Sequence, residues 1–117
     1  MAISLDEVLG LFNKWLTERT ALMGISTSTG LSVIFLGVFT RYDSESCRLS
    51  ATADGVGPLN VFIFPRHVVD FEYQDVHEAP EQARDLLMGR GVVAVLIARF
   101  PTSTLALYEM ESTKGDI

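Results

Sequence analysis

A basic and aromatic segment in the middle of the chain holds the residue types best suited to a binding site. Arg66 and His67 follow Phe64, and Phe71 comes shortly after them. Aromatic rings offer faces for base stacking, and an arginine adds a cation that contacts phosphate. One basic pair supplies few of the phosphate contacts that strong binding needs. The segment therefore predicts either a nucleic-acid contact or a turn whose polar residues simply face water.

Acidic side chains and a histidine gather just after this segment. Asp70 and Glu72 fall on one face of a predicted strand, and Asp75, His77 and Glu78 follow. Carboxylate oxygens are the ligands of hard cations. The spacing matches no recognised metal motif, however, and carboxylates at a strand end ordinarily face solvent. We expect no metal and no cofactor.

The residues that most often carry out catalysis stand in no recognised catalytic pattern. His67 and His77 lie in no nucleophile elbow or zinc motif, and the segment 55–58 lacks the lysine of a phosphate-binding loop. Cys47, the single cysteine, has no neighbouring base and is expected to be a small core residue. We therefore predict a protein that is not an enzyme, and the sequence identifies no small-molecule substrate. A hydrolase or ligand-binding domain would need a closed pocket beside one of the histidines.

Length and composition indicate one folded domain. The chain has 117 residues, of which 48% are hydrophobic and 21% are charged, which excludes a disordered chain. Its longest apolar run, 92–98, is far shorter than the roughly 20 residues that a membrane-spanning helix needs, and its first residues lack the basic start of a secretory signal. We expect a cytoplasmic protein with no membrane contact. The net charge of −6 repels a phosphate backbone on average.

A helix is predicted at the N-terminus, over residues 4–23. Ser4 and Glu7 form a capping box, and apolar residues then recur at three- and four-residue spacing, which is typical of a helix that packs on a core. Gly24 is expected to cap the C-terminal end of this helix. The apolar positions are Leu5, Val8, Leu9, Phe12, Trp15 and Leu16.

Residues 25–73 predict a strongly bent antiparallel sheet. The segment 31–39 is apolar on both faces, and Gly37 within it fits a bend or a bulge. After a turn at 42–46, the next strand alternates between apolar and polar residues, so that one of its faces is expected to be wet.

The second half of the chain predicts a kink, a helix and a hairpin. Pro65 interrupts a strand because proline has no N–H to donate, so two strands are expected to share a kink at 65–67, where a small barrel turns a corner. A short helix at 81–88 follows, and two strands at 92–100 and 104–110 form a hairpin.

This order of elements resembles the Sm-like family at two motifs. Residues 37–43 resemble the first Sm motif, in which a glycine lets the strand bend and an aromatic residue and an aspartate reach the loop, and Leu49 stands where that motif has its next leucine. Residues 61–63 followed by 68–69 are similar to the second motif, two short strands around a tight turn. Arg66–His67 is similar to the Lys-His pair of the bacterial Sm-like RNA chaperone.

The resemblance implies a barrel, a closed ring of subunits joined by strand pairing, and an RNA-binding site at Arg66, His67, Phe64 and Asp43. The chain departs from the family pattern at two positions. Cys47 stands where the family has the asparagine that helps to grip uracil, and the Arg-Gly of the second motif is replaced by Phe64–Pro65.

The sequence therefore predicts one α+β domain over residues 1–117. It comprises an N-terminal helix (4–23), a small, strongly bent antiparallel Sm-like barrel (25–73) and an added helix and β-hairpin (80–110). The first functional hypothesis is a non-enzymatic homo-oligomer that binds RNA at an atypical site. The alternative is a protein-interaction or structural module that binds no nucleic acid.

Overall fold

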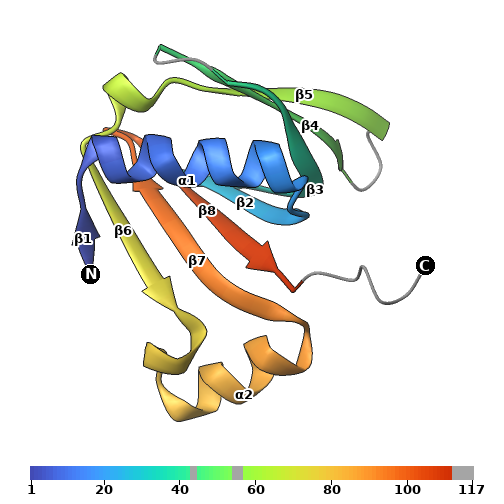
Figure 1. Cartoon of the computed structure of the whole chain (residues 1–117), viewed down its shortest axis with the longest axis vertical. Coiled ribbons are helices and arrows are strands. Elements are labelled where there is room, and N and C mark those ends of the chain that lie inside the picture. Colours follow the sequence, from blue (N-terminus) through green and yellow to red (C-terminus); the bar gives the residue numbers. More distant parts are fainter. Residues whose placement is uncertain (43–44, 54–56, 112–117) are drawn as a thin grey trace.

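The structure is a computed structural model that describes residues 1–42, 45–53 and 57–111. One helix lies across one face of a curved antiparallel sheet, and a second, shorter helix lies at the far end of the strands (Figure 1). In chain order the elements are β1 (Ala2–Ile3), α1 (Leu5–Glu18), β2 (Leu22–Ser28), β3 (Leu31–Tyr42), β4 (Cys47–Ala53), β5 (Gly57–Ile63), η1 (Pro65–His67), β6 (Asp70–Asp75), η2 (Val76–Glu78), α2 (Glu81–Gly89), β7 (Val92–Arg99) and β8 (Ser103–Met110).

The eight strands form one sheet in the order β1-β6-β7-β8-β2-β3-β4-β5, and each neighbouring pair is antiparallel. The predicted α+β class, with an N-terminal helix on an antiparallel sheet, is therefore confirmed. The sheet does not close on itself, since β5 and β1 stand at its two ends. The hairpin β7–β8, predicted as an added element, lies inside the sheet between β6 and β2.

The capping box at the start of α1 is present. The Glu7 backbone N–H donates to Ser4 Oγ at 3.2 Å, and the Ser4 backbone N–H donates to Glu7 Oε1 at 3.3 Å. The predicted end of the helix near residue 23 is wrong, because the helix ends at Glu18 and its cap is Arg19, in the left-handed conformation with φ 54°.

Gly24, predicted as the helix cap, lies in β2 instead. From Leu22 onward the chain pairs with β3 on one side and β8 on the other, and these two ladders override the apolar spacing that suggested a longer helix. A Cβ atom at Gly24 would overlap the ring of Phe35, the residue opposite it on β3. Glycine is therefore needed here for close packing and not for a turn.

The core lies between α1 and the concave face of the sheet. Val8, Phe12 and Trp15 of α1 are buried, as their spacing predicted. The Phe12 and Trp15 rings lie 5.0 and 5.8 Å from the ring of Phe39 on β3, centroid to centroid. Cys47 is buried in the same core, which confirms its predicted role. Burying large aromatic side chains of this kind contributes most of the apolar area that stabilises a small domain.

A bend or bulge was expected at Gly37. The irregularity in β3 lies two to four residues further along the strand. The pairing with β4 shifts register between Phe39 and Arg41. Gly37 lets β4 approach closely, because a Cβ atom there would lie 2.5 Å from the carbonyl oxygen of Ser50 and 2.9 Å from the Cβ atom of Ala51.

The predicted kink at 65–67 is the one-turn helix η1, with Pro65 at its start. It joins β5, at one end of the strand order, to β6, which is next to β1 near the other end. The sheet therefore curls far enough for a short segment to pass from one end to the other (Figure 1). Among the described residues, no helix is long and apolar enough to span a bilayer.

Replacing Gly37 with alanine is expected to lower the free energy of unfolding by about 1–3 kcal/mol, because the new methyl group meets backbone atoms that cannot move aside. Gly10→Ala is the matched control. Its Cβ atom enters open space on a helix, so stability should rise by up to about 1 kcal/mol. Urea unfolding of both variants measures the difference. Equal stability of Gly37→Ala and the natural chain would contradict the close approach of β3 and β4.

Candidate functional site

Three of the four predicted RNA-binding residues lie together at η1. Arg66 and His67 are exposed on this turn. Phe64 directly precedes it, is 46% exposed, and stacks on His67 with ring centroids 5.8 Å apart and planes 25° apart. Asp43, the fourth predicted residue, lies outside the described residues.

Strand register adds Arg48 and Phe62 to this group. They are direct partners across β4 and β5, and Phe62 is 58% exposed. Arg48 Nε donates to Thr40 Oγ1 at 3.0 Å, which holds the guanidinium over the sheet. We call this group the aromatic corner: Arg48, Phe62, Phe64, Arg66 and His67. The sequence alone did not point to Arg48 or Phe62, because only the pairing of the strands brings them together.

The face of the sheet opposite α1, here called the outer face, carries an apolar patch. Ile34 and Leu36 of β3 are 53% and 58% exposed. Their partners on β2 are apolar, and so are most of the residues that pair with these partners on β8. Monomeric proteins seldom expose contiguous apolar surface without a function for it. The patch consists of Met23, Ile25, Ile34, Leu36, Ile97 and Tyr108.

A polar ladder separates the apolar patch from the sheet edge. The Thr40 and Ser50 hydroxyls lie 3.1 Å apart, and Ser50 Oγ donates to Asn60 Oδ1 at 3.3 Å. The ladder therefore runs from β3 through β4 and ends at Asn60, in the middle of β5. The Asn60 side-chain oxygen accepts from Ser50, whereas the exposed Asn60 side chain leaves its amide NH₂ at the edge of the sheet.

The strand β5 is an open edge, since it pairs only with β4. Pro58 lies opposite Thr52 in an unbroken register, and it has no N–H to give to that strand. The bonds to β4 therefore come from the alternate residues, starting with Gly57 and Leu59. The backbone N–H groups of Asn60 and Phe62, and the carbonyl of Pro58, consequently point away from the sheet.

The acidic cluster after η1 forms ion pairs within the sheet. The Arg99 guanidinium lies 2.7 Å from Asp70 and 2.9 Å from Glu72, and its hydrogen bond lowers the pKa of Glu72. Asp75 Oδ1 accepts from the His77 backbone N–H at 2.9 Å. In the ranges that the structure describes, no three His, Cys, Asp or Glu residues are arranged to hold a metal ion.

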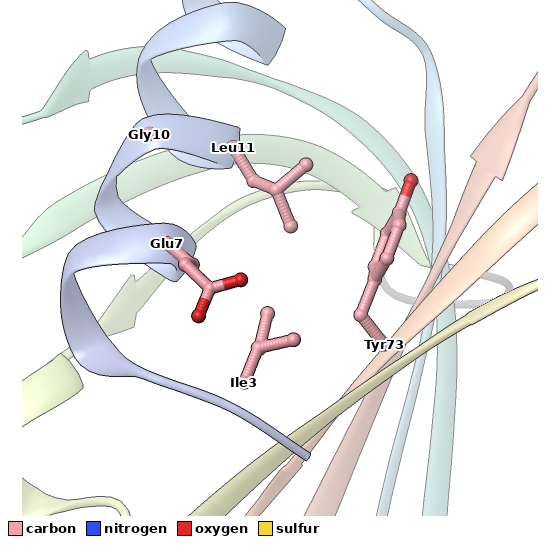
Figure 2. A pocket seen from close by; sticks show the side chains of 5 residues that line it. All are labelled: Ile3, Glu7, Gly10, Leu11 and Tyr73. Atoms are coloured by element: carbon pink, nitrogen blue, oxygen red, sulfur yellow. The ribbon is translucent and has the colours of Figure 1, made fainter. Parts of the chain in front are cut away.

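A cleft of about 370 Å³ opens between α1 and the strands β1 and β6. Figure 2 shows Ile3, Leu11 and the Glu7 carboxylate facing the ring of Tyr73 across it. Gly10 also lines the cleft. Neither histidine does, so this cleft is not the pocket that a histidine-based hydrolase would need.

Beside the cleft, Tyr73 connects to a buried carboxylate. The Tyr73 hydroxyl donates to Glu109 Oε1 at 3.5 Å, and the indole Nε1 of Trp15 donates to the same oxygen at 2.5 Å. Glu109 is 7% exposed. Burial, followed by the nearby charge of Glu109, raises the pKa of Tyr73 to about 12, so the hydroxyl keeps its proton at neutral pH.

The sequence analysis did not identify Glu109, although the alternation of residues along the last strand places it on the buried face. Leu105, Leu107 and Glu109 share one face of β8, and all three are buried. A carboxylate in phase with two core leucines is unusual, because a buried charge needs hydrogen-bond donors. The donors come from Trp15 and Tyr73, which are far from it in sequence, so the sequence could not name them.

The fold defines an α+β protein with one helix on an open eight-stranded antiparallel sheet. Comparisons with protein-family models, curated proteins and solved structures found no match to the chain. Functional inference therefore depends on the aromatic corner, the open edge, the apolar patch and the cleft.

Tyr73 is expected to make stability fall at high pH. A tyrosine in the unfolded chain ionises near pH 10, whereas the raised pKa of Tyr73 keeps its proton in the fold until about pH 12. The contribution of the protonated Tyr73 to the free energy of unfolding is therefore fully present below pH 10 and is lost as the pH rises towards 12. In urea unfolding between pH 9 and 12, the free energy of unfolding of Tyr73→Phe should fall less with rising pH than that of the natural chain. Identical pH profiles for Tyr73→Phe and the natural chain would rule out this role.

Proposed function

We propose that this protein is a non-enzymatic interaction module whose working unit is a dimer, formed by pairing of two β5 edges. The observation that carries the proposal is the open edge itself. An unpaired strand presents a row of donors and acceptors that another strand can satisfy. The residues Gly57–Ile63 include no charged side chain, although the whole chain carries a net charge of −6.

The opposite end of the sheet lacks these properties. There β1 contains only two residues, which pair with Phe71 and Glu72 of β6. Charged side chains lie beside it, including Asp70 and Arg99. Short strands and charges are the usual devices that prevent edge pairing. One end of the sheet is thus protected and the other is open, which favours a two-fold pair of β5 strands over a closed ring that would use both ends.

The chemistry of β5 suits a two-fold axis at Asn60. With Asn60 opposite Asn60 of the second copy, the Phe62 N–H donates to the Pro58 carbonyl across the interface. Each Phe62 ring then lies beside the Pro58 ring of the other chain. Ser50 occupies Asn60 Oδ1 and leaves the amide NH₂ to donate across the axis. No like charges oppose each other along the strand.

Such a dimer has one continuous sheet with both apolar patches on the same outer face. A two-fold axis perpendicular to the sheet keeps the outer faces of the two copies on one side. The exposed Ile34 and Leu36 of each copy would then form the binding surface for a protein partner. An apolar surface rimmed by polar residues is typical of such interfaces.

The Sm-like relationship is part of this proposal. The order of α1, the strands β2–β5, the turn η1 and β6 supports an Sm-like unit, and β5–η1–β6 corresponds to the two short strands around a tight turn. The hairpin β7–β8 lies between β6 and β2, which accounts for an open sheet in place of a barrel.

Substitution of Asn60 tests the dimer directly. Asn60→Lys and Asn60→Asp each place like charges opposite one another at the axis, so each should raise the dimer dissociation constant by up to roughly fivefold. An equimolar mixture of the two variants should restore the dimer, because an introduced ammonium then faces an introduced carboxylate. Size-exclusion chromatography with light scattering measures the mass against the 12.9 kDa of one chain.

Leu36→Lys is the matched control for Asn60→Lys, since Leu36 is also an exposed strand residue but lies away from the edge. This variant should keep the dimer mass. A monomer at all concentrations, a ring of six or seven chains, or a dimer lost only in Leu36→Lys would each contradict pairing through β5.

RNA binding at the aromatic corner is the second candidate function. The stacked Phe64 and His67 rings offer a platform for a base, and the exposed Arg66 offers a phosphate contact. The net charge of −6 opposes such binding, so the candidate depends on this corner alone.

If RNA binds there, Arg66→Ala should abolish binding and rising salt should weaken it steeply. Fluorescence anisotropy with a labelled single-stranded oligouridine, at two salt concentrations, measures both effects. Arg84→Ala on α2 is the control and should change nothing. Binding that is indifferent to salt and to Arg66 would exclude the aromatic corner as the site.

A further inference from the structure

We propose that the cleft between α1 and β6 binds a small apolar molecule that carries a protonated amine. This site lies on α1, β1 and β6, away from the edge strand β5, so the inference stands independently of the proposed dimer. Its basis is the shape of the cleft, its apolar walls and the Glu7 carboxylate among the lining residues.

The cleft has the size and the walls of a small-molecule site. Its volume of about 370 Å³ lies within the range of roughly 300–1,000 Å³ that is typical of such sites. Ile3, Leu11 and the ring of Tyr73 form the walls (Figure 2). These side chains pack against the core but remain partly exposed. An apolar ligand would remove their remaining surface from water, which is favourable.

The Glu7 carboxylate is the charged group among the residues that line the cleft. One carboxylate oxygen of Glu7, Oε1, receives the Ser4 backbone N–H and hydroxyl at 3.3 and 3.1 Å, which leaves Oε2 available. The Tyr73 hydroxyl donates to Glu109, and the exposed lining of the cleft is almost wholly apolar. A positively charged head group complements the Glu7 carboxylate, whereas a carboxylate head group does not.

The charges around the cleft agree with a cationic ligand. The Met1 ammonium is engaged by the Tyr73 carbonyl at 3.2 Å and by Glu72 at 4.0 Å. Asp6 and Glu7 in the first turn of α1 offset the partial positive charge of the helix N-terminus. The net charge of −6 attracts cations over a longer range.

Gly10 keeps the cleft open from the helix side. Gly10 lines the cleft, and a Cβ atom at this position would meet no heavy atom within 4 Å, so a side chain has room to begin here. Gly10→Leu should therefore fill the site and preserve the fold, since leucine is a better helix former than glycine.

The test uses three probes with the same eight-carbon chain on the full-length protein: n-octylamine, n-octanol and octanoate. Isothermal titration calorimetry at pH 7 measures the dissociation constants. We expect octylamine to bind about tenfold more tightly than octanol, which is the gain of one charge-assisted hydrogen bond. Octanoate should bind most weakly.

Two variants separate the charge from the cavity. Glu7→Gln keeps a capping-box residue and removes the charge, so octylamine should lose about tenfold in affinity while octanol is unaffected. Gly10→Leu should abolish binding of both. Gly89→Leu places the same side chain in open space at the end of α2 and should leave binding unchanged.

Several results would overturn the inference. Equal affinity for the three probes would show that the charge has no role. An equal loss of affinity for octanol and octylamine in Glu7→Gln would show the same. Binding that survives Gly10→Leu in a protein with normal thermal unfolding would place the ligand elsewhere. Absence of octylamine binding at millimolar concentration would exclude the site.

Discussion

The indole of Trp15 connects α1 to the sheet, and the rest of the structure depends on this contact. Its ring stacks on Phe39 of β3, while its N–H donates to the buried carboxylate of Glu109 on β8. The sheet is curled but open, so its concave face would be wet without a helix in this position. A buried carboxylate is stable only with donors directed at it, and Trp15 and Tyr73 supply them.

This arrangement determines where the molecule has binding surfaces. The helix can cover the concave face, but it leaves a cleft on the side of β1 and β6 and does not cover the edge of β5. The outer face exposes Ile34 and Leu36. The proposed dimer and the proposed amine site are therefore two consequences of one open sheet covered by one helix.

Local signals in the sequence predicted local structure well. The capping box at Ser4, the buried stripe of α1 and the turn at Pro65 depend on neighbouring residues, and each is present in the structure. The end of α1 was misjudged because apolar spacing continues past Glu18 into a strand that is buried between two others. Gly24 was then predicted as a helix cap and Gly37 as a bend or bulge, although both are required for close packing across strands.

Features that depend on strand order and register could not be predicted from the sequence alone. The pairing of Arg48 with Phe62, the insertion of β7–β8 between β6 and β2, and the donors to Glu109 all join segments that are separated along the chain. The aromatic corner was therefore predicted only in its contiguous part, Phe64 to His67. The cleft was not predicted, because its walls come from β1, α1 and β6.

Backbone amide hydrogen exchange at Asn60 and Phe62, followed by NMR across protein concentration, tests the central claim most directly. In one chain these two N–H groups point away from the sheet, so they should exchange at nearly unprotected rates at high dilution. If two β5 edges pair, both amides should become protected as the concentration rises, while Leu59, bonded to β4, stays protected throughout. Unprotected exchange at Asn60 and Phe62 at every concentration would contradict the account.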